Sequence, residues 1–384
     1  MGELVHDVEP FGEAVCDFLP LRWYSRANMT RKRLAILTGG GDCPGLNAVI
    51  RAAVRTATHD YDFDVLGIQL GFEGLLTDST VPLTAASIRG ILPKGGTLLR
   101  TTNRGNPFAY PVEGGGFEDR SATVLETVAR LGIDGVIAIG GDGTLKIAQS
   151  LFEMGVPIVG VPKTIDNDLA ATDYTFGFMT AVGVATDAVD RLHTTAESHD
   201  RVMILEVMGR NCGWIALYSG LAGGADIILI PEIAYSPEHI VRSIGERSNE
   251  GSKFDIIVVA EGAKRAGGEE SYLDPASRRL GGIAYQVAAD IAQHIDFEIR
   301  VTVLGHIQRG GSPIAFDRIL ATRFGKAAAD LCARGQFGRM VALRENKIVS
   351  VPIGDAISNL KRVDPAGEMI STARSLGISF GDSH

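Results

Sequence analysis

Short apolar runs recur along the chain, and each is followed by glycine or by polar residues. A strand covered on both faces of a parallel sheet reads as such a run, so the runs predict buried strands. They lie at residues 34–37, 65–69, 136–139, 156–161, 202–207, 227–230, 256–260 and 301–304. Helical stretches fall between them, at residues 47–58, 145–153 and 176–195. This alternation predicts an α/β fold with mainly parallel sheets.

The length of 384 residues fits two Rossmann-like lobes. Most predicted strands deliver polar groups at their carboxyl ends, the ligand edge of a doubly wound sheet, so we expect the active site in the cleft between the lobes. One lobe is expected to combine residues 33–177 with about 308–345, and the other to combine residues 178–307 with the C-terminal segment. Residues 1–32 show no strand-like pattern and are expected to form an N-terminal extension.

Charge and composition exclude several classes of protein. The net charge of -9 argues against a nucleic-acid binder but leaves a small anionic substrate open, since local arginines can override it. No apolar run reaches the ~18 residues of a membrane span, and no signal-peptide pattern opens the chain, so no membrane partner is expected. Four widely spaced cysteines indicate reduced thiols and a cytoplasmic location: Cys16, Cys43, Cys212 and Cys332.

The densest polar cluster follows the apolar run at residues 156–161. It places Lys163, Thr164, Asp166 and Asp168 in one short stretch. Two acids beside a lysine and a hydroxyl, at the end of a buried strand, cost solvation energy unless chemistry uses them. A solvated turn with Lys163 as its ion-pair partner would contain the same residues. Taken alone, the cluster leaves both interpretations open.

Two glycine-rich turns lie at other strand ends. Residues 39–41 link a strand to a helix, a geometry that points backbone N–H groups at an anion, although tight turns also use glycine. Residues 140–144, Gly-Gly-Asp-Gly-Thr, place Asp142 between glycines near a helix start. That arrangement suits Mg²⁺ held together with phosphates. The same five letters also occur in NAD kinases and lipid kinases, so they indicate phosphoryl transfer without naming the acceptor.

Four motifs in this order resemble the 6-phosphofructokinase family: Gly-Gly-Asp-Gly-Thr (140–144), Pro-Lys-Thr-Ile-Asp-Asn-Asp (162–168), Glu-Val-Met-Gly-Arg (206–210) and Gly-His-Ile-Gln-Arg-Gly-Gly (305–311). The resemblance runs from about Arg33 into the last forty residues. Residues 194–199 resemble the branch that contains both ATP- and pyrophosphate-dependent bacterial enzymes. The resemblance implies the phosphofructokinase fold, Mg²⁺ as cofactor and phosphoryl transfer from ATP to the C1 hydroxyl of fructose 6-phosphate.

The resemblance also implies roles for single residues. Asp166 would be the general base, Arg210 would stabilise the transferring phosphoryl group, and Lys163 would place a cation near it. The substrate site would comprise Thr164, Asp168, Arg201, Met208, Gly209, Glu261, Arg300, His306 and Arg309. The donor site would comprise Gly41, Arg104, Asp142, Gly143 and Thr144, with Asp142 on Mg²⁺. One extra residue in the loop makes Asn103 compete with Arg104 for its position.

The family pattern implies a homo-oligomer, dimer or tetramer, in which Arg201 and Arg300 reach the sugar site of a neighbouring subunit. Arg51 and Arg55 match a pair that lines an effector pocket in the family, and a solvated helix face explains them equally well. The third basic position of that pocket is His193, and the lysines before the strand at 256–260 are missing. These departures argue against the family's usual nucleotide regulation.

The donor is the open chemical question. Gly143 leaves room for the α-phosphate of ATP, whereas an aspartate there favours pyrophosphate in this family. Lys163 is typical of the pyrophosphate type, and Ile147 replaces a small residue expected beneath adenine. Steric exclusion discriminates more strongly than an added cation, so ATP is favoured and pyrophosphate is the alternative. A non-catalytic sugar-phosphate-binding paralogue is a further alternative, which the presence of Asp166, Asp142 and Arg210 makes less attractive.

Overall fold

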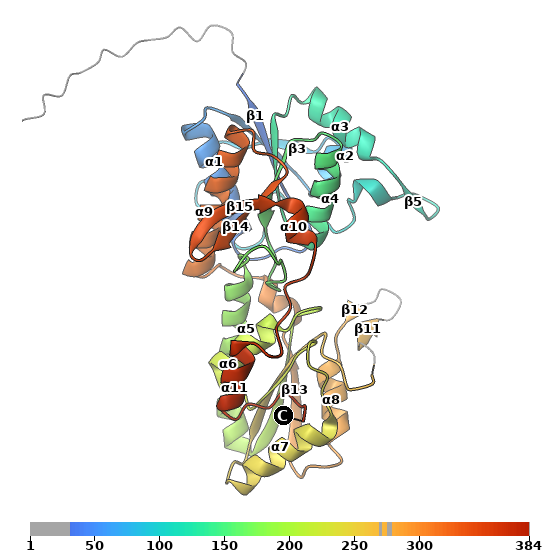
Figure 1. Cartoon of the computed structure of the whole chain (residues 1–384), viewed down its shortest axis with the longest axis vertical. Helices are drawn as coiled ribbons and strands as arrows, with labels where there is room; N and C mark the ends of the chain where they lie inside the picture. Colours follow the sequence, from blue (N-terminus) through green and yellow to red (C-terminus); the bar gives the residue numbers. More distant parts are fainter. Residues whose placement is uncertain (1–30, 269–270, 275–278, 384) are drawn as a thin grey trace, which may run out of the picture. The chain divides into compact units, whose positions relative to one another are not determined.

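Two sheets organise the part of the chain that the computed structural model describes, residues 31–268, 271–274 and 279–383 (Figure 1). The seven-stranded sheet has the order β15 (Lys347–Pro352), β14 (Arg339–Arg344), β7 (Ile158–Pro162), β6 (Gly135–Gly140), β1 (Arg33–Thr38), β2 (Asp64–Ile68), β3 (Thr80–Pro82). The four-stranded sheet has the order β13 (Glu298–Val303), β8 (Arg201–Val207), β10 (Asp255–Ala260), β9 (Ile227–Leu229). The central pairs are parallel, as predicted, and within the described strands of these two sheets antiparallel pairing occurs at the edge pairs β2–β3 and β14–β15.

Helices cover both faces of the seven-stranded sheet. The core on one face includes α1 (Leu46–His59) and α9 (Ala315–Ala333), and the core on the other includes α3 (Ser121–Arg130), α4 (Asp142–Glu153) and α10 (Ile353–Ile357) (Figure 1). The alternation along β1 explains this, because Leu34 and Ile36 belong to the first core and Ala35 and Leu37 to the second. Apolar side chains on both faces of one strand produce the continuous run seen in the sequence.

The four-stranded sheet is covered in the same way. The core shared with the first sheet continues through α5 (Phe178–His199) and α6 (Trp214–Gly223), and a separate core lies under α7 (Pro237–Asn249) and α8 (Ile283–Ile291). The other elements are short: α2 (Glu73–Leu76), η1 (Pro107–Ala109), β4 (Tyr110–Pro111), β5 (Phe117–Glu118), β11 (Tyr272–Asp274), β12 (Arg279–Leu280), η2 (Gly305–Arg309) and α11 (Glu368–Ser375). Among the described residues no helix has the length and apolar character that a membrane crossing requires.

Element boundaries differ from the predictions by a few residues, and one difference bears on the site. The helix predicted from residue 145 begins at Asp142, so Gly143 and Thr144 belong to the first turn of α4. Their backbone N–H groups therefore lie among the unpaired donors of a helix N-terminus. The strands β3, β14 and β15 were not predicted, and the predicted extension at residues 1–32 lies almost wholly outside the described residues.

A buried carboxylate joins the starts of α5 and α9. Asp317 Oδ2 accepts hydrogen bonds from the Thr180 backbone N–H at 2.7 Å and from the Thr180 hydroxyl at 2.5 Å. We expect Asp317→Ala to lower the free energy of unfolding by about 1–3 kcal/mol, because both buried donors lose their acceptor. Urea unfolding measures this, with Asp187→Ala on the exposed face of α5 as the control that should leave the midpoint unchanged. An unchanged midpoint for Asp317→Ala would contradict the stabilising role of its hydrogen bonds to Thr180.

Candidate functional site

The polar cluster at residues 163–168 follows β7, with Lys163 and Asn167 buried and Thr164, Asp166 and Asp168 half-buried. Lys163 is 4% exposed and Asn167 is 2% exposed. The Thr164 hydroxyl accepts a hydrogen bond from the Asp166 backbone N–H at 3.1 Å. Asn167 Oδ1 accepts from the Thr175 backbone N–H at 3.1 Å. The cluster is therefore an ordered, internally bonded turn, and the solvated-turn interpretation is wrong.

The two acids of this turn are held in an environment that favours their protonated forms. Burial, and then the neighbouring Asp168, raise the pKa of Asp166 to about 7. Burial also raises the pKa of Asp168. Each acid leaves its Oδ1 atom buried without a hydrogen-bond partner within the described part of the chain. Buried oxygens without partners are costly unless a bound group supplies a donor or a cation, so these two atoms mark a ligand site.

Glycines let the donor turn approach this cluster closely. The ammonium of Lys163 donates to the carbonyl of Gly41. Thr144 is wedged between two strand ends, since a Cβ atom on Gly39 would lie 2.6 Å from Thr144 Oγ1 and one on Gly140 would lie 2.3 Å from Thr144 Cβ. Because β1 and β6 are parallel neighbours, their carboxyl ends bring both glycine turns to one edge of the sheet.

A cavity of about 380 Å³ opens beside these turns. The first turn of α4 forms one wall, and a Cβ atom on Gly143 would meet no atom within 4 Å. Asn103 lines the cavity, whereas Arg104 is exposed and stands outside that lining. Ile147 also lines the cavity, so the apolar side chain noted in the sequence does face this space. The helix N-terminus and the open space at Gly143 together suit a phosphate chain.

The residues present fit a magnesium ion that is bound partly by protein carboxylates and partly by the phosphates of the substrate. Among the described residues no cluster of three or more His, Cys, Asp or Glu side chains could bind a metal by itself. Mg²⁺ in phosphoryl-transfer sites takes one or two carboxylates and completes its shell with phosphate oxygens and water. Asp142 is a single carboxylate at the first position of α4, next to Gly143 of the cavity lining, and it accepts a hydrogen bond at 2.8 Å from Lys146 one helical turn away.

A second group of candidate residues follows β8 and β10. The Gly209 N–H donates to the carboxylate of Glu261, and a Cβ atom on Gly262 would lie 1.9 Å from the carbonyl oxygen of Arg210, so the two strand ends are tightly packed. Met208, which precedes this turn, is 9% exposed. Burial raises the pKa of Glu261, and among the weaker influences Arg309 and Arg210 oppose that shift.

Arg309 connects the two groups of residues. Its Nη1 atom donates to the carbonyl of Asp42 at 3.3 Å and would lie 2.9 Å from a Cβ atom on Gly41. The same guanidinium acts electrostatically on Asp166 and Glu261, alongside the dominant effect of burial. His306, also on η2, is exposed. The donor turn, the acid pair and the end of β10 therefore surround one guanidinium.

Arg201 and Arg300 lie elsewhere within the chain. Both bond to Glu298, Arg201 through Nε at 2.5 Å, at the amino-terminal ends of β8 and β13. Met208 and Glu261 follow the carboxyl ends of strands in the same parallel sheet. At about 3.3 Å per residue, the length of β8 separates Arg201 from Met208 by roughly 20 Å, farther than an arginine side chain reaches. One chain does not bring these arginines to the other sugar-site candidates.

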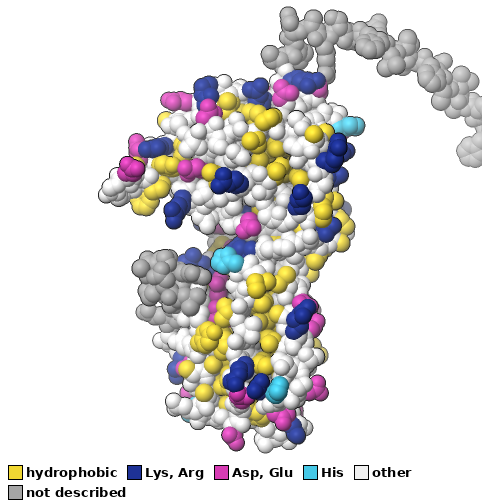
Figure 2. Space-filling model, turned by 180° about the vertical axis from the view of Figure 1, so that it is seen from behind, with side chains coloured by type: hydrophobic (Ala, Val, Ile, Leu, Met, Phe, Trp, Pro, Cys, Tyr) yellow, Lys and Arg dark blue, Asp and Glu magenta, His cyan; other side chains and the backbone are white. Residues whose placement is uncertain are grey.

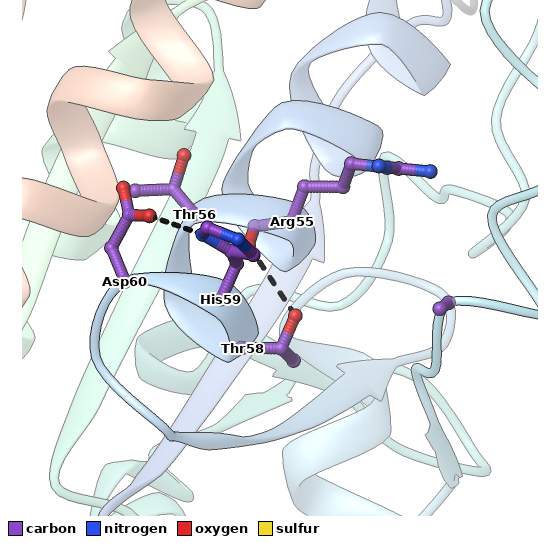
Figure 3. A pocket seen from close by; sticks show the side chains of 6 residues that line it. Arg55, Thr56, Thr58, His59 and Asp60 are labelled. Carbon is purple, nitrogen blue, oxygen red and sulfur yellow. Dashed lines mark hydrogen bonds and ion pairs between the residues drawn. The ribbon is translucent and has the colours of Figure 1, made fainter. Parts of the chain in front are cut away.

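A larger cavity of about 490 Å³ lies at the carboxyl end of α1 (Figure 3). It is lined by Arg55, Thr56, Thr58, His59, Asp60 and Ala85. Figure 3 shows the Arg55 side chain extending away from the His59–Asp60 pair, whose atoms Nδ1 and Oδ1 are 2.7 Å apart. His193 is occupied elsewhere, bonded to the carbonyl of Gly224 at 3.1 Å and packed edge-to-face on Phe254. The described chain thus gives His193 a structural role.

Sequence reasoning missed one residue that contacts the acidic turn. Lys361 donates from Nζ to Asn167 Oδ1 at 3.0 Å. No motif surrounds it, and it is separated from the turn by almost two hundred residues, so no local pattern could have indicated the contact. Asn103 was named only as a competitor of Arg104, because an extra loop residue left the alignment of the two ambiguous.

Comparisons with known proteins agree with this geometry. The family model described as "Phosphofructokinase" matches residues 33–332. An ATP-dependent 6-phosphofructokinase of Chloroflexus aurantiacus is 54% identical over 353 residues, covering 92% of this chain and 98% of the relative. A pyrophosphate–fructose 6-phosphate 1-phosphotransferase of Streptomyces coelicolor is 51% identical over 355 residues, covering 91% of this chain and all of the relative.

Solved structures show the same fold. The phosphofructokinase of Saccharomyces cerevisiae superposes with a TM-score of 0.73 at 31% identity, covering 91% of this chain and 48% of that one. A pyrophosphate-dependent phosphofructokinase from Nitrosospira multiformis superposes with a TM-score of 0.77 at 19% identity, covering 91% of this chain and 93% of that one, which supports the fold alone. The predicted fold class and family are therefore confirmed, and an assignment to NAD kinases or lipid kinases is excluded.

The raised pKa of Asp166 predicts how stability changes with pH. The carboxyl has an ordinary value of 3.8 when unfolded and about 7 when folded. The stability that its protonated form contributes is therefore complete below pH 3.8 and is lost as pH rises to about 7. Asparagine has no such proton to lose. The advantage of Asp166→Asn over wild type should thus grow through this window by on the order of 1 kcal/mol per pH unit and then level off.

Urea unfolding at several pH values between 5 and 8.5 measures this difference. Asp355→Asn, at an exposed carboxyl on α10, is the control and should show no growing advantage. Parallel pH dependence of wild type and Asp166→Asn would mean that Asp166 is ionised in the folded protein at every pH tested.

Proposed function

Because the chain belongs to the phosphofructokinase family, we propose that it is a phosphotransferase that moves the γ-phosphoryl group of ATP to the C1 hydroxyl of fructose 6-phosphate. The product is fructose 1,6-bisphosphate, and the reaction is a step of glycolysis. One observation supports this most strongly: Asp166 and Asp168, each with a buried oxygen that has no partner among the described residues, lie beside the glycine turns that open on the cavity. A general base and an anion-binding turn at one strand edge are the two groups that this transfer needs.

The proposed mechanism begins with proton removal from the sugar. Asp166 accepts the proton of the C1 hydroxyl, whose oxygen forms a bond to the γ-phosphorus while the bond from that phosphorus to the oxygen of ADP breaks. A pKa of about 7 suits this role, because about half of such carboxyl groups are free of their proton at neutral pH and the carboxylate is basic enough to take one. The Thr164 hydroxyl accepts a hydrogen bond from the Asp166 N–H and so helps to orient Asp166 towards the C1 hydroxyl.

Cations would balance the charge of the moving phosphoryl group. Lys163 lies against the Gly41 carbonyl, and Arg210 lies in the turn between β8 and α6. Arginine in such a position stabilises charge that develops in the transition state. Asp142 would hold Mg²⁺, which when bound neutralises the phosphate oxygens of the donor. The first turn of α4, with Gly143 and Thr144, would bind the same phosphates through backbone N–H groups.

The structure supports ATP over pyrophosphate through the space at Gly143. A cavity of about 380 Å³ continues past this glycine, and pyrophosphate alone would leave much of it empty. Relatives named for each donor are similar to the chain at nearly equal identity, so sequence similarity does not choose between them. Lys163 suits the terminal phosphoryl group of either donor, which keeps pyrophosphate as the alternative. A non-catalytic paralogue is not favoured, because Asp142, Asp166 and Arg210 are all retained.

We further propose a dimer or tetramer in which Arg201 and Arg300 complete the sugar-phosphate site of a neighbour, together with His306 and Arg309 of that neighbour. Two observations support this. Arg201 lies roughly 20 Å from Met208 of its own chain, at about 3.3 Å per strand residue, and Arg300, which pairs with Met203, lies about 16 Å from Met208 by the same measure. Large apolar side chains are also exposed on and after β13: Val303, Ile307, Ile314, Phe316 and Ile319. Figure 2 shows hydrophobic side chains exposed among polar ones on the face that it presents.

The lobes would divide the work as predicted from the sequence. Residues 33–177 with about 308–345 would bind the donor, and residues 178–307 with the C-terminal segment would bind the sugar phosphate. A cytoplasmic location fits the buried free thiols Cys43, Cys212 and Cys332, while Cys16 lies outside the described residues.

Comparing both donors tests the proposal and the role of Gly143. With fructose 6-phosphate as acceptor, wild type should give a higher kcat/KM with ATP than with pyrophosphate. Gly143→Asp should nearly abolish ATP use, because a carboxylate facing the α-phosphate repels it by several kcal/mol at short range in a partly desolvated cleft. Pyrophosphate ends before that point, so its kcat/KM should be kept or raised relative to ATP.

The Asp166→Asn protein is the control for contaminating phosphotransferase and should lose on the order of 10²–10⁴ in kcat. A wild type that prefers pyrophosphate would refute ATP as donor. A Gly143→Asp protein that uses ATP undiminished would refute the steric argument, and no transfer from either donor would refute the proposed function.

Mixing two inactive variants tests the shared sugar site. Arg300→Ala should raise KM for fructose 6-phosphate and leave the donor KM nearly unchanged. After subunit exchange, Arg300→Ala and Asp166→Asn chains should regenerate intact sites, because the base and the arginine then come from different chains. Roughly a quarter of wild-type sites should return in a random equal mixture, since each contribution is intact half the time. Absence of recovery after verified exchange would place both groups in one chain.

A further inference from the structure

The segment between α10 and α11 runs past the acidic turn and joins it to the four-stranded sheet. Leu360 forms an isolated antiparallel bridge with Leu169, and the Lys361 N–H donates to the carbonyl of Asp168 at 2.8 Å. On its other side, the carbonyl of Lys361 accepts from Trp214 Nε1 at 2.7 Å. The backbone of Lys361 therefore forms hydrogen bonds both to the acidic turn and to the first residue of α6.

The next contact of this segment is made two residues later, by Val363. The Val363 N–H donates to the Glu232 carboxylate at 2.9 Å. That carboxylate also accepts from the N–H of Gly213, which precedes α6, at 3.1 Å. The turn that contains Arg210 and ends at α6 is thus bonded to the same short segment as the acids.

The ammonium of Lys361 has three acceptors for its three protons. Nζ donates to Asn167 Oδ1 at 3.0 Å, to the carbonyl of Thr172 at 3.0 Å and to the carbonyl of Asp173 at 2.7 Å. Burial lowers the pKa of Lys361 to about 8, which the charges of Asp173 and Asp168 oppose. A partly buried cation is tolerable when every donor is used, and here all three are.

One of these acceptors fixes an unusual backbone conformation between the two acids. Asn167 has φ of 52°, in the left-handed region that residues other than glycine seldom adopt. Its Oδ1 atom receives hydrogen bonds from Lys361 Nζ and from the Thr175 N–H. This conformation sets the directions in which Asp166 and Asp168 project, because it lies between them. Holding Asn167 therefore holds the geometry of the acid pair.

We propose that Lys361 is a positioning residue for phosphoryl transfer: its ammonium fixes Asn167 and with it Asp166 and Asp168, and its backbone ties this turn to Trp214 and the Arg210 turn. This inference rests on the proposed function for its effect on catalysis. In this proposal Lys361 contacts neither the substrate nor the reacting atoms. It acts through the acid pair, so its loss should slow turnover more than it weakens binding.

Three variants separate positioning from simple packing. Lys361→Met keeps the length and volume of the side chain but loses the charge and all three donors. Lys361→Arg keeps the charge and several donors. Arg344→Met is the matched control: Arg344 is an exposed cation next to the same loop, with Nη1 3.9 Å from Asp173 and Nη2 3.4 Å from the Ala170 carbonyl, and it does not contact Asn167.

Steady-state kinetics should be measured well below the melting temperature of every variant. We expect Lys361→Met to lower kcat about 10–100-fold, a typical cost of misplacing a reacting group by about 1 Å, with each KM changed less than about threefold. Lys361→Arg should retain several times the kcat of Lys361→Met, and Arg344→Met should match wild type. If Lys361 only filled space, methionine would serve better than arginine. Equal kcat for Lys361→Met and wild type would overturn the proposal.

Hydrogen–deuterium exchange gives a readout that does not depend on activity. The Thr175 amide is bonded to Asn167 Oδ1 and reports directly on the clamp. A peptide covering residues 164–175 should exchange faster in Lys361→Met than in wild type or Arg344→Met. Unchanged exchange would overturn the proposed clamp even if wild type proved inactive on fructose 6-phosphate. Faster exchange with an inactive wild type would instead refute the proposed function and leave the clamp in place.

Discussion

The burial of Asp166 and Asp168 side by side is the constraint on which the rest of the site depends. Two carboxylates in one low-dielectric turn resist ionisation together, and a single buried charge without partners costs several kcal/mol. The positive charges of Arg309 and Lys163 oppose the raised pKa of Asp166 only in part. What remains is an acid that is half-protonated near neutral pH, which is the condition under which a carboxyl serves as a base.

The phosphate-donor side of the site depends on the close approach of the strand ends to the first turn of α4, and not on charge alone. Thr144 occupies the space that a side chain on Gly39 or Gly140 would need, so both strand ends can meet the first turn of α4. A bulkier residue at either glycine would separate the anion-binding N–H groups from the acidic turn. At Gly143 the reverse holds, because the space there is empty and a side chain would reach into the cavity. The same residue type thus has two distinct physical functions within one short sequence.

The strand directions separate the sugar-site candidates into two groups. Met208, Gly209 and Glu261 follow the carboxyl ends of β8 and β10, whereas Arg201 and Arg300 share Glu298 at the opposite ends. A strand is rigid over its length, so no side-chain rotation brings these groups together within one chain. An oligomer would resolve this, and the exposed apolar side chains around β13 and η2 support one. Assembly and catalysis would then depend on the same edge strand.

The sequence by itself determined the features that depend on neighbours along the chain. Apolar runs and glycine turns placed Asp142 and Asp166 at consecutive strand ends, and the pairing of β6 with β7 in parallel confirms that neighbouring position. Contacts between distant segments were decided by the tertiary structure alone. The partners of Lys361, the pairing of β14 with β7 and the pKa of Asp166 all depend on which residues surround a group after folding. Local patterns record hydrophobicity and turn chemistry but not the burial and long-range bonding that set these properties.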